Sequence, residues 1–564
     1  MSGLLIVNGL LVDGTGAQGR QADLRVRDGR IAEIGTGLVP QEGEQVIDAA
    51  GAIVAPGFID SHTHYDATIY WDPTLDPMPQ HGVTTVVAGN CSLGLAPMRA
   101  EDRAGQIDVY SYIEDMPADL LSQVIPWDWE SYPEYARSLG KTPMGVNLTT
   151  YVGHSQLRCH VMGQAAWQRT ATSEEIAEMA AELDEALAAG ALGMSFSLFD
   201  KDRDGRPVPS CLADDAEMDA LCARLGKAGG SLQFVLGTTT EGIIGHIEWL
   251  ASFLGPHGVT GFYNILVDLD SDPQRSRSIV QCLERRQAEG VRIYGLVSPR
   301  PVVLQIGFEQ SLCFIDLPAW NRLVQADLPE KRRLASDPQW RAQARQEADT
   351  SPAVMFPFRR IHKLTINGVA RPELQEWFGR SMSEMVEARG AHESDVLADW
   401  LIENDFAATF TFAIANTDVE QVARLLTSPV GLVSASDAGA HLQMFCAAGD
   451  ATLLLTRHVR ERGDLTLEAA VHSLTGRQAD VLGLGDRGVL APGKAADLVI
   501  FALEELHYGP ERLVNDLPGG GARLTRDPGG FRYTIVNGQP VQQAGKATGA
   551  LPATWLARGL ARAA

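Results

Sequence analysis

The stretch GFIDSHTHYD, residues 57–66, ends an apolar run with two histidines that are one residue apart. The apolar residues up to Ile59 predict a buried strand. Because side chains alternate along an extended backbone, His62 and His64 are expected on the same face of that strand end. Two neutral imidazoles that point together can hold one zinc-like ion. The same spacing also occurs in ordinary loops, so on its own it leaves both interpretations open.

Strand-like apolar runs alternate with helical patterns from residue 56 to about residue 480. The runs include GVTTVVAG, GVNLTTYVG, GALGMSFSL, GFYNILVDL, VRIYGLVS and VGLVSASDAG. Helical stretches between them, such as SEEIAEMAAELDEALAAG, end in glycine, as a C-terminal cap predicts. Repeated β-then-α units favour a parallel barrel or a doubly wound sheet. We predict an α/β fold, a (β/α)8 TIM-like barrel, whose chemistry lies at the carboxyl ends of the strands.

Both ends of the chain differ in their sequence pattern from the middle. Residues 1–55 and 481–564 contain short β-rich runs broken by turn dipeptides such as Asn-Gly and Asp-Gly. Neither set makes a convincing core alone, so we predict that they pair into one small β-sandwich domain. Residues 300–380, rich in Pro, Trp, Arg and Phe, fit the alternation poorly and indicate a lid inserted over the barrel mouth. A surface excursion without a role in substrate binding is the alternative.

Charge and composition limit the possible partners. Of the 564 residues, 47 are Lys or Arg and 71 are Asp or Glu, which gives a formal charge of −24. With this charge and no dense basic run, nucleic acid and anionic membranes are poor partners. No segment approaches the roughly 18 apolar residues of a membrane span, and the N-terminus lacks a basic start, so we expect a cytoplasmic protein. The seven cysteines are sparse and indicate reduced thiols. A homo-oligomer is compatible with a chain of this size.

Further candidates for chemistry follow other predicted strands. Cys91 comes just after the run that ends at Gly89, where a thiolate can ligate a metal; a small buried hydrophobe is the alternative. Asp437 and His441 follow the last run, in GLVSASDAGAHL. A carboxylate at that place can bind an ion, accept a proton from water and later protonate a leaving amine, with His441 as a substrate contact. An N-cap of the next helix is the alternative for Asp437.

The remaining candidates have equally good structural explanations. His154 closes the third run and suits an oxyanion donor or a substrate contact, but also an ordinary core histidine. Arg158, Ser195, Ser197 and Arg300 lie at or just after predicted strand ends. An arginine there can pair bidentately with a substrate carboxylate. An internal salt bridge explains the same arginines.

Six segments together carry a family resemblance: PGFIDSHTHYD, GVTTVVAGNCSLGLAPMR, VGHSQLR, GALGMSFSL, SDAGAH and APGKAADLVIF. In this order, across nearly the whole chain, they resemble the amidohydrolase superfamily and within it the N-acyl-D-amino-acid deacylase (D-aminoacylase) group. The resemblance implies a metal-bearing (β/α)8 barrel with a small terminal β domain that hydrolyses a C–N bond. His62 and His64 match the group's first-strand ligands, Cys91 its cysteine ligand, and Asp437 its catalytic aspartate.

The sequence departs from that group at two strand ends. The group carries further histidine ligands at the ends of the fifth and sixth strands, where this chain has Gln233 and Asn264. His246 and His257 fall in or after the helical pattern between those strands. A lysine that could bridge two ions is also missing from GALGMSFSL. We therefore expect one ion, most simply Zn²⁺, rather than a binuclear centre.

The expected arrangement is an ion held by His62, His64 and Asp437, with Cys91 as a fourth ligand. It predicts a metal-dependent amidohydrolase that cleaves the amide bond of an N-acyl amino acid, in particular an N-acyl-D-amino acid, by attack of activated water. Asp437 would move the protons and His154 would stabilise the oxyanion. Another amide, a cyclic amide or a lactone is the alternative substrate on this site. A catalytically inactive barrel that acts as a binding protein is the alternative from a different class.

Overall fold

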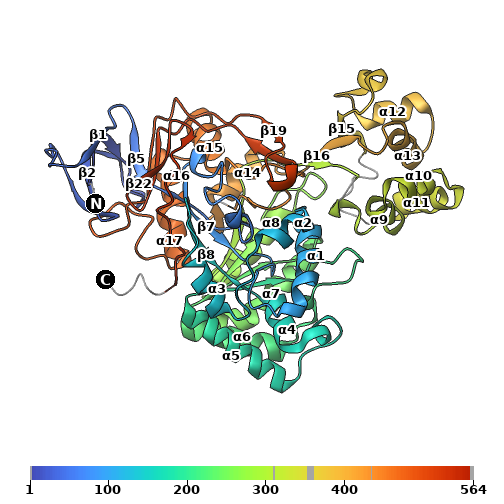
Figure 1. Cartoon of the computed structure of the whole chain (residues 1–564), viewed down its shortest axis with the longest axis horizontal. Helices are drawn as coiled ribbons and strands as arrows, with labels where there is room; N and C mark the ends of the chain where they lie inside the picture. Colours follow the sequence, from blue (N-terminus) through green and yellow to red (C-terminus); the bar gives the residue numbers. More distant parts are fainter. Residues whose placement is uncertain (1–2, 309–310, 352–360, 434, 559–564) are drawn as a thin grey trace.

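The computed structural model describes residues 3–308, 311–351, 361–433 and 435–558. Figure 1 shows three regions: a β-sheet region near the N-terminus, a central region of parallel strands covered by helices, and a helical lobe at the opposite end. The central region carries the residues that the sequence marks for chemistry. The chain is therefore an α/β protein, as its alternating pattern predicts.

Two parallel sheets make up the centre. The larger contains β9 (Val152–Gly153), β10 (Gly193–Ser197), β11 (Ser231–Val235), β12 (Thr260–Asn264), β13 (Ile293–Val297) and β17 (Gly431–Val433), in the order β17-β13-β12-β11-β10-β9. The smaller contains β6 (Phe58–Asp60), β7 (Val83–Ala88) and β8 (Asn147–Thr150). Tyr151 leads directly from β8 into β9, and Thr63 beyond β6 bridges Ala438 beyond β17 in parallel. The two sheets therefore meet at both edges.

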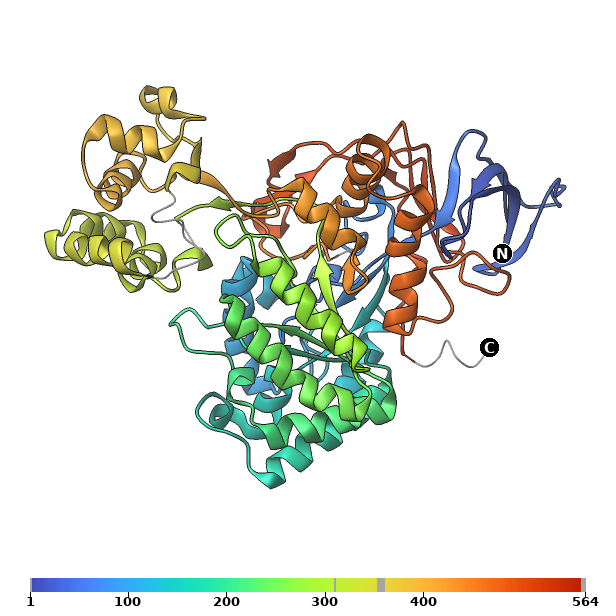
Figure 2. The ribbon, with the colours of Figure 1, turned by 180° about the vertical axis from the view of Figure 1, so that it is seen from behind.

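Helices cover the outside of these strands, as Figure 2 shows from behind. Between successive strands of the larger sheet run α5 (Ser173–Ala189), α6 (Asp215–Ala228), α7 (Thr240–His257) and α8 (Arg275–Ala288). Thr172 caps the start of α5 with its hydroxyl, and Gly190 ends that helix at φ 113°, a conformation that glycine adopts without strain. The further helices are α1 (Arg103–Glu114), α2 (Ala118–Val124), α3 (Tyr132–Leu139), α4 (His154–Met162), α14 (Val419–Thr427), α15 (Asp450–Leu453), α16 (Leu467–Leu474) and α17 (Gly476–Leu482).

Strands from both ends of the chain share one nine-stranded sheet. It contains β1 (Leu4–Leu11), β2 (Arg20–Arg27), β3 (Arg30–Gly35), β4 (Gln45–Asp48), β5 (Ile53–Pro56), β18 (Leu498–Phe501), β21 (Tyr533–Val536), β22 (Gln539–Gln543) and β23 (Lys546–Ala547). β5 pairs antiparallel with β18, so the two ends of the chain meet at that pair. Buried Asp497 fastens this sheet to the centre, because it accepts hydrogen bonds from Asn147 Nδ2 of β8 at 3.1 Å and from Asn537 N at 2.8 Å.

The insertion lobe leaves the centre after β13. It contains β14 (Val302–Ile306), α9 (Pro318–Gln325), α10 (Leu328–Ser336), α11 (Pro338–Thr350), β15 (Leu364–Gly368), α12 (Met382–Arg389), α13 (Glu393–Glu403) and β16 (Thr409–Ala415). Its strands form a separate antiparallel sheet in the order β14-β16-β15. The excursion therefore continues past the expected end at residue 380, as far as Ala415, because β16 is the strand that pairs with β14. Residues 352–360, which belong to the predicted lid, lie outside the described residues.

Side-chain contacts tie this lobe to the centre. Asn321 Nδ2 and Gln325 Nε2 of α9 both donate to the backbone oxygen of Arg203, at 3.2 and 2.6 Å. Lys201 Nζ lies 2.9 Å from Asp316 Oδ1. Lys201 and Arg203 belong to the loop after β10, so α9 lies against the carboxyl-end side of the parallel strands.

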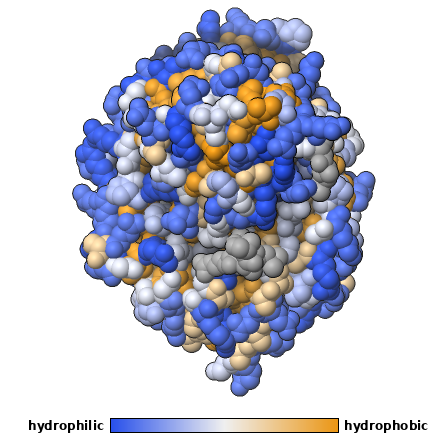
Figure 3. Space-filling view, turned by 90° about the vertical axis from the view of Figure 1, so that its left-hand side faces the viewer, coloured by the Kyte–Doolittle hydropathy of each residue, from blue (hydrophilic) through white to orange (hydrophobic). Residues whose placement is uncertain are grey.

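One face of the molecule is mostly hydrophilic. Figure 3 shows one face on which hydrophilic side chains predominate and apolar ones gather in a patch in its upper part. In the described part of the chain, no helix has the length and apolar character that a membrane crossing requires.

A glycine turn at the end of β7 sets the course of the chain into the segment that holds Cys91. Gly89 has φ 72°, and its N–H donates to Asp66 Oδ2 at 3.0 Å. A Cβ at this position would lie 2.6 Å from the backbone oxygen of Tyr151. Both the left-handed backbone and the close approach therefore require glycine.

We expect Gly89→Ala to lower the thermal midpoint far more than Gly51→Ala. Gly51 has nearly the same φ, 71°, but a Cβ added there would have no neighbouring atom within 4 Å, so alanine there costs only the left-handed strain of about 1–2 kcal/mol. Gly89→Ala adds steric overlap with backbone, typically about 1–3 kcal/mol more. Calorimetry of the two variants measures the difference. Equal midpoints would show that the Tyr151 contact does not constrain this turn.

Candidate metal centre

Four potential ligands converge at the carboxyl ends of three strands. One ligand atom each from His62, His64 and Cys91 lies within 4.8 Å of the others. Asp437 Oδ1 lies 3.4 Å from His62 Nε2 and 3.2 Å from His64 Nε2. The histidines follow β6, Cys91 follows β7, and Asp437 follows β17. The structure thus brings together residues from opposite ends of the central fold.

Backbone hydrogen bonds fix the two ends against each other. Asp437 N donates to the oxygen of His62 at 3.0 Å, and His64 N donates to the oxygen of Ala438 at 2.7 Å. The buried Asp60 carboxylate accepts from both His62 N and Ser436 N at 3.3 Å. These bonds span the junction of the two sheets, so the spacing between the imidazoles and Asp437 is set by main chain.

Cys91 stands in a turn that side chains hold. Cys91 and Ser92 have φ values of 54° and 61°, and two successive left-handed residues that are not glycine cost free energy. The turn is compensated by side-chain acceptors: Gln233 Oε1 accepts from Cys91 N at 2.7 Å, and Ser195 Oγ accepts from Ser92 N at 2.9 Å. This conformation places Cys91 Sγ 3.5 Å from His62 Nε2.

Other polar side chains surround the four. Glu114, the last residue of α1, has Oε1 at 3.1 Å from His64 Nδ1 and Oε2 at 4.0 Å from His441 Nε2. His441 Nε2 lies 3.8 Å from Asp437 Oδ2. Asn264 Nδ2, at the end of β12, lies 3.9 Å from Cys91 Sγ. No local pattern marks Glu114 in the sequence, because its role depends on how α1 packs beside β6.

Residues 45–542 match the sequence pattern described as the amidohydrolase family. This range covers most of the chain and all the strands that carry the four ligands. The chain belongs to the amidohydrolase family. The expected resemblance is therefore confirmed at the level of the family.

Several known proteins are similar to this chain over most of its length. An uncharacterised protein of Mycobacterium tuberculosis is 32% identical over 88% of this chain and 84% of its own. The N-acyl-D-aspartate deacylase of Alcaligenes xylosoxydans xylosoxydans is 30% identical over 88% and 85% of the two chains. The N-acyl-D-glutamate deacylase of Bordetella bronchiseptica, solved with zinc and a phosphonate mimic of the tetrahedral intermediate, is 26% identical with a TM-score of 0.69, covering 98% of this chain and 99% of that one.

The donor set of this amidohydrolase suits a divalent ion. Two imidazoles, a thiol and a carboxylate are the ligand types of zinc sites. Burial lowers the pKa of His62, so this imidazole is neutral and has a free lone pair. Burial raises the pKa of the Cys91 thiol to about 12, and a cation nearby favours the thiolate instead. Glu114 beside His64 Nδ1 is the arrangement in which a carboxylate orients an imidazole whose other nitrogen faces an ion.

His154 and Arg158 lie in a different network. His154 Nε2 is 2.7 Å from Glu217 Oε1, and its Nδ1 is 3.0 Å from Ser210 Oγ. Arg158 pairs with the same Glu217 carboxylate, and His154, Arg158 and Glu217 are all fully buried. The structure therefore gives His154 and Arg158 internal partners rather than a face toward substrate. The internal explanation, left open by the sequence, fits both.

Ser195, Ser197 and Arg300 also contact protein groups. Ser195 supports the turn at Ser92, as described above. Ser197 Oγ donates to Asp200 Oδ2 at 2.7 Å. Arg300 Nε donates to Asp450 Oδ1 at 3.0 Å and its Nη2 to the oxygen of Ser436 at 2.5 Å. Arg300 thus braces the backbone next to Asp437, and the expectation that it binds a substrate carboxylate has no support in these contacts.

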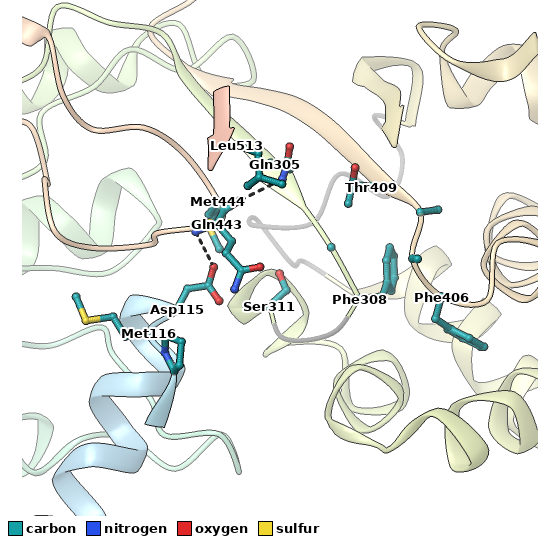
Figure 4. Close-up of a pocket in the computed structure, with 14 residues that line it drawn as sticks. Asp115, Met116, Gln305, Phe308, Ser311, Phe406, Thr409, Gln443, Met444 and Leu513 are labelled. Atoms are coloured by element: carbon teal, nitrogen blue, oxygen red, sulfur yellow. Dashed lines mark hydrogen bonds between the residues drawn. The ribbon is translucent and has the colours of Figure 1, made fainter. Parts of the chain in front are cut away.

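A cavity of about 410 Å³ lies between the end of α1, the strands β14 and β16, and the segment after His441 (Figure 4). Asp115 Oδ2 accepts from Gln443 N at 3.2 Å on one side of it. Its apolar walls are formed by Met116, Phe308, Phe406, Met444 and Leu513. Asp115 follows Glu114 directly, and Gln443 lies two residues beyond His441, but none of the four potential ligands is among the residues that line this cavity.

We expect Glu114→Gln to weaken divalent-ion binding by about 10-fold or more, the usual lower range for loss of a carboxylate behind a histidine ligand. Glu217→Gln is the matched control, because Glu217 is also a buried carboxylate beside a histidine but contacts His154. The control should lower stability and leave ion affinity unchanged. Competition titration with a chromophoric chelator measures both affinities. Equal losses in the two variants would contradict the role assigned to Glu114.

Proposed function

We propose that this chain is a metal-dependent hydrolase of C–N bonds that cleaves the amide bond of an N-acyl amino acid, with N-acyl-D-amino acids as the substrate class. The observation that carries the proposal is the convergence of His62, His64, Cys91 and Asp437 in a member of the amidohydrolase family. Relatives that cover most of the chain are deacylases of N-acyl-D-amino acids. The substrate is a small molecule, which suits a site enclosed by loops and an inserted lobe.

His62, His64 and Asp437 would hold one divalent ion, with Cys91 as the fourth ligand, and Zn²⁺ matches this donor set best. When bound, such an ion acts as a Lewis acid that polarises a carbonyl and acidifies a water molecule. The imidazoles are fully enclosed, whereas 24% of the Asp437 side chain is exposed. Access to the site is therefore from the side of Asp437.

Asp437 is the residue placed to move protons. Burial would raise its pKa, but in the ion-free protein hydrogen bonds from His62 and His64 hold the pKa well below its usual value, and a bound cation would favour the carboxylate in the same way. Asp437 is thus a carboxylate at neutral pH, able to accept a proton from the attacking water. The protonated side chain then delivers that proton to the nitrogen as the C–N bond breaks, so that the amine leaves neutral and Asp437 is restored.

The cavity lined by Asp115 and Gln443 would receive the part of the substrate that differs between N-acyl amino acids, which is the acyl group or the side chain. Its described lining combines apolar side chains with neutral polar ones and a single carboxylate, Asp115, and contains no lysine, arginine or histidine. Such a lining suits an uncharged acyl group or side chain. α9, fastened to the loop after β10, would serve as the predicted lid.

We also propose that the two parallel sheets, which meet at both edges, form the expected (β/α)8 barrel within residues 56–480. Residues 1–55 and 481–564 would make up the small β-sandwich domain. Support comes from the Thr63–Ala438 bridge and from the β5–β18 pair.

We expect the purified enzyme to hydrolyse N-acetyl-D-amino acids with uncharged side chains faster than the L-enantiomers. Removing the ion with a chelator should abolish turnover, and adding Zn²⁺ should restore it. Asp437→Asn should lower kcat by about 10²–10⁴-fold, the range for loss of a general acid–base group. Ninhydrin detection of the released amino acid measures all three. Turnover of a lactone but of no N-acyl amino acid, or full activity after chelation, would refute the proposal.

A further inference from the structure

The reaction proposed above needs a hydrogen-bond donor for the oxygen of the scissile carbonyl, and the residue expected from the sequence is not free to act. Both ring nitrogens of His154 already contact Ser210 and Glu217, and the ring is fully buried. Two carboxamides occupy the side of the cluster next to Cys91. They belong to Gln233 of β11 and Asn264 of β12.

Gln233 is anchored by its oxygen and leaves its nitrogen without a partner. Oε1 accepts from Cys91 N at 2.7 Å, which fixes the carboxamide beside the cluster. The side chain is only 1% exposed, and Nε2 has no hydrogen-bond partner among the described residues. An unsatisfied buried donor costs free energy, so this N–H is available to an acceptor that arrives with a ligand.

Asn264 lies on the strand next to Gln233 and nearer the open side of the site. In the parallel pairing of β11 with β12, Gln233 lies opposite Phe262, and Val235 lies opposite Asn264. Since alternate residues share a face, Asn264 stands on the same face as Gln233, one side-chain step nearer the carboxyl edge. It is half-buried, and its Nδ2 lies 3.9 Å from Cys91 Sγ. Its amide is therefore next to the cluster and accessible to a bound molecule.

We propose that Asn264 is a catalytic residue whose Nδ2–H donates to the carbonyl oxygen of the substrate amide as that oxygen gains negative charge. Gln233 is the second donor through Nε2 and the positioning residue of Cys91 through Oε1. In the addition step, water oxygen bonds to the carbonyl carbon, its proton passes to Asp437, and the C=O π electrons move to the oxygen that Asn264 contacts. In the elimination step, the C=O bond re-forms, the C–N bond breaks, and Asp437 returns the proton to nitrogen.

Preorganised donors of this kind act on the transition state more than on the substrate. Both carboxamides are neutral, so they stabilise a developing negative charge without binding a carboxylate strongly in the ground state. Loss of either carboxamide should therefore lower kcat, whereas loss of a residue that only anchors the substrate should raise KM. The inference rests on the proposed hydrolysis and assigns the donors for it.

The test compares Asn264→Leu, which keeps the size of the side chain but removes the donor, with Gln543→Met. Gln543 is a carboxamide in β22 of the nine-stranded sheet, where Nε2 donates to the Tyr533 hydroxyl at 3.0 Å. We expect Asn264→Leu to retain zinc, measured by plasma emission, to keep KM within a few-fold of wild type, and to lose about 10²–10³-fold in kcat. Its affinity for an N-acyl phosphonate, measured by calorimetry, should fall by a factor similar to the loss in kcat/KM. The Gln543 variant should match wild type in all four quantities.

Gln233→Met separates the two functions of Gln233. It should lose zinc affinity as well as kcat, because Cys91 N loses its acceptor. Should Asn264→Leu prove insoluble, Asn264→Ala and Asn264→Ser serve in its place, with serine expected to recover part of the loss. Loss of zinc from the Asn264 variants, or parallel changes in KM and phosphonate affinity with unchanged kcat, would overturn the inference while wild-type activity stands. A wild-type enzyme without any amide hydrolysis would instead overturn the proposed function and this inference with it.

Discussion

Two main-chain hydrogen bonds hold the candidate centre together: Asp437 N to the oxygen of His62, and His64 N to the oxygen of Ala438. They join the first parallel strand to the last. Neither the histidines nor the aspartate would face a common point if the two sheets met elsewhere, because each side chain is short and its direction follows from its backbone. Asp60, which accepts from both segments, makes the junction resistant to sliding. The chemistry of the site therefore depends on the closure of the sheets before it depends on any side chain.

Buried charges reinforce this junction rather than the substrate site. Arg300 is paired with Asp450 and donates to the oxygen of Ser436, one residue before Asp437. Arg158 and His154 share the Glu217 carboxylate. A buried ion pair adds little net stability, but breaking one by removing a partner is strongly unfavourable. Such pairs thus fix a geometry, and Arg300 with Asp450 fixes the segment from which Asp437 projects.

The alternation of side chains along a strand predicted that His62 and His64 share a face, and the position of a residue just after an apolar run placed Cys91 and Asp437 at strand ends. These placements use only local geometry and the rule that parallel strands place their carboxyl ends together, whereas the expected ligand set came from the resemblance to the amidohydrolase superfamily. His154, Arg158 and Arg300 satisfy the same local criteria, yet their partners come from α6 and α15. Which polar group faces an arginine is decided by tertiary packing, and no spacing in the sequence carries it. Glu114 escaped prediction for the same reason, and β16 could not be assigned to the insertion lobe before its pairing with β14 was known.

The turn at Cys91 and Ser92 explains why a carboxamide rather than an imidazole stands at Gln233 of β11. Its two successive N–H groups point away from any strand partner and need acceptors. Gln233 Oε1 and Ser195 Oγ supply them. A neutral imidazole has one acceptor nitrogen and would lose it to the backbone, whereas a carboxamide that accepts through oxygen still keeps two N–H donors. Gln233 can therefore hold Cys91 and still donate hydrogen bonds to a ligand. Its hydrogen bond to Cys91 N also offsets part of the free energy that the strained turn costs. On this argument Gln233 supports Cys91 and keeps donors for an oxygen, whereas a histidine that accepted from Cys91 N would have no lone pair left for an ion.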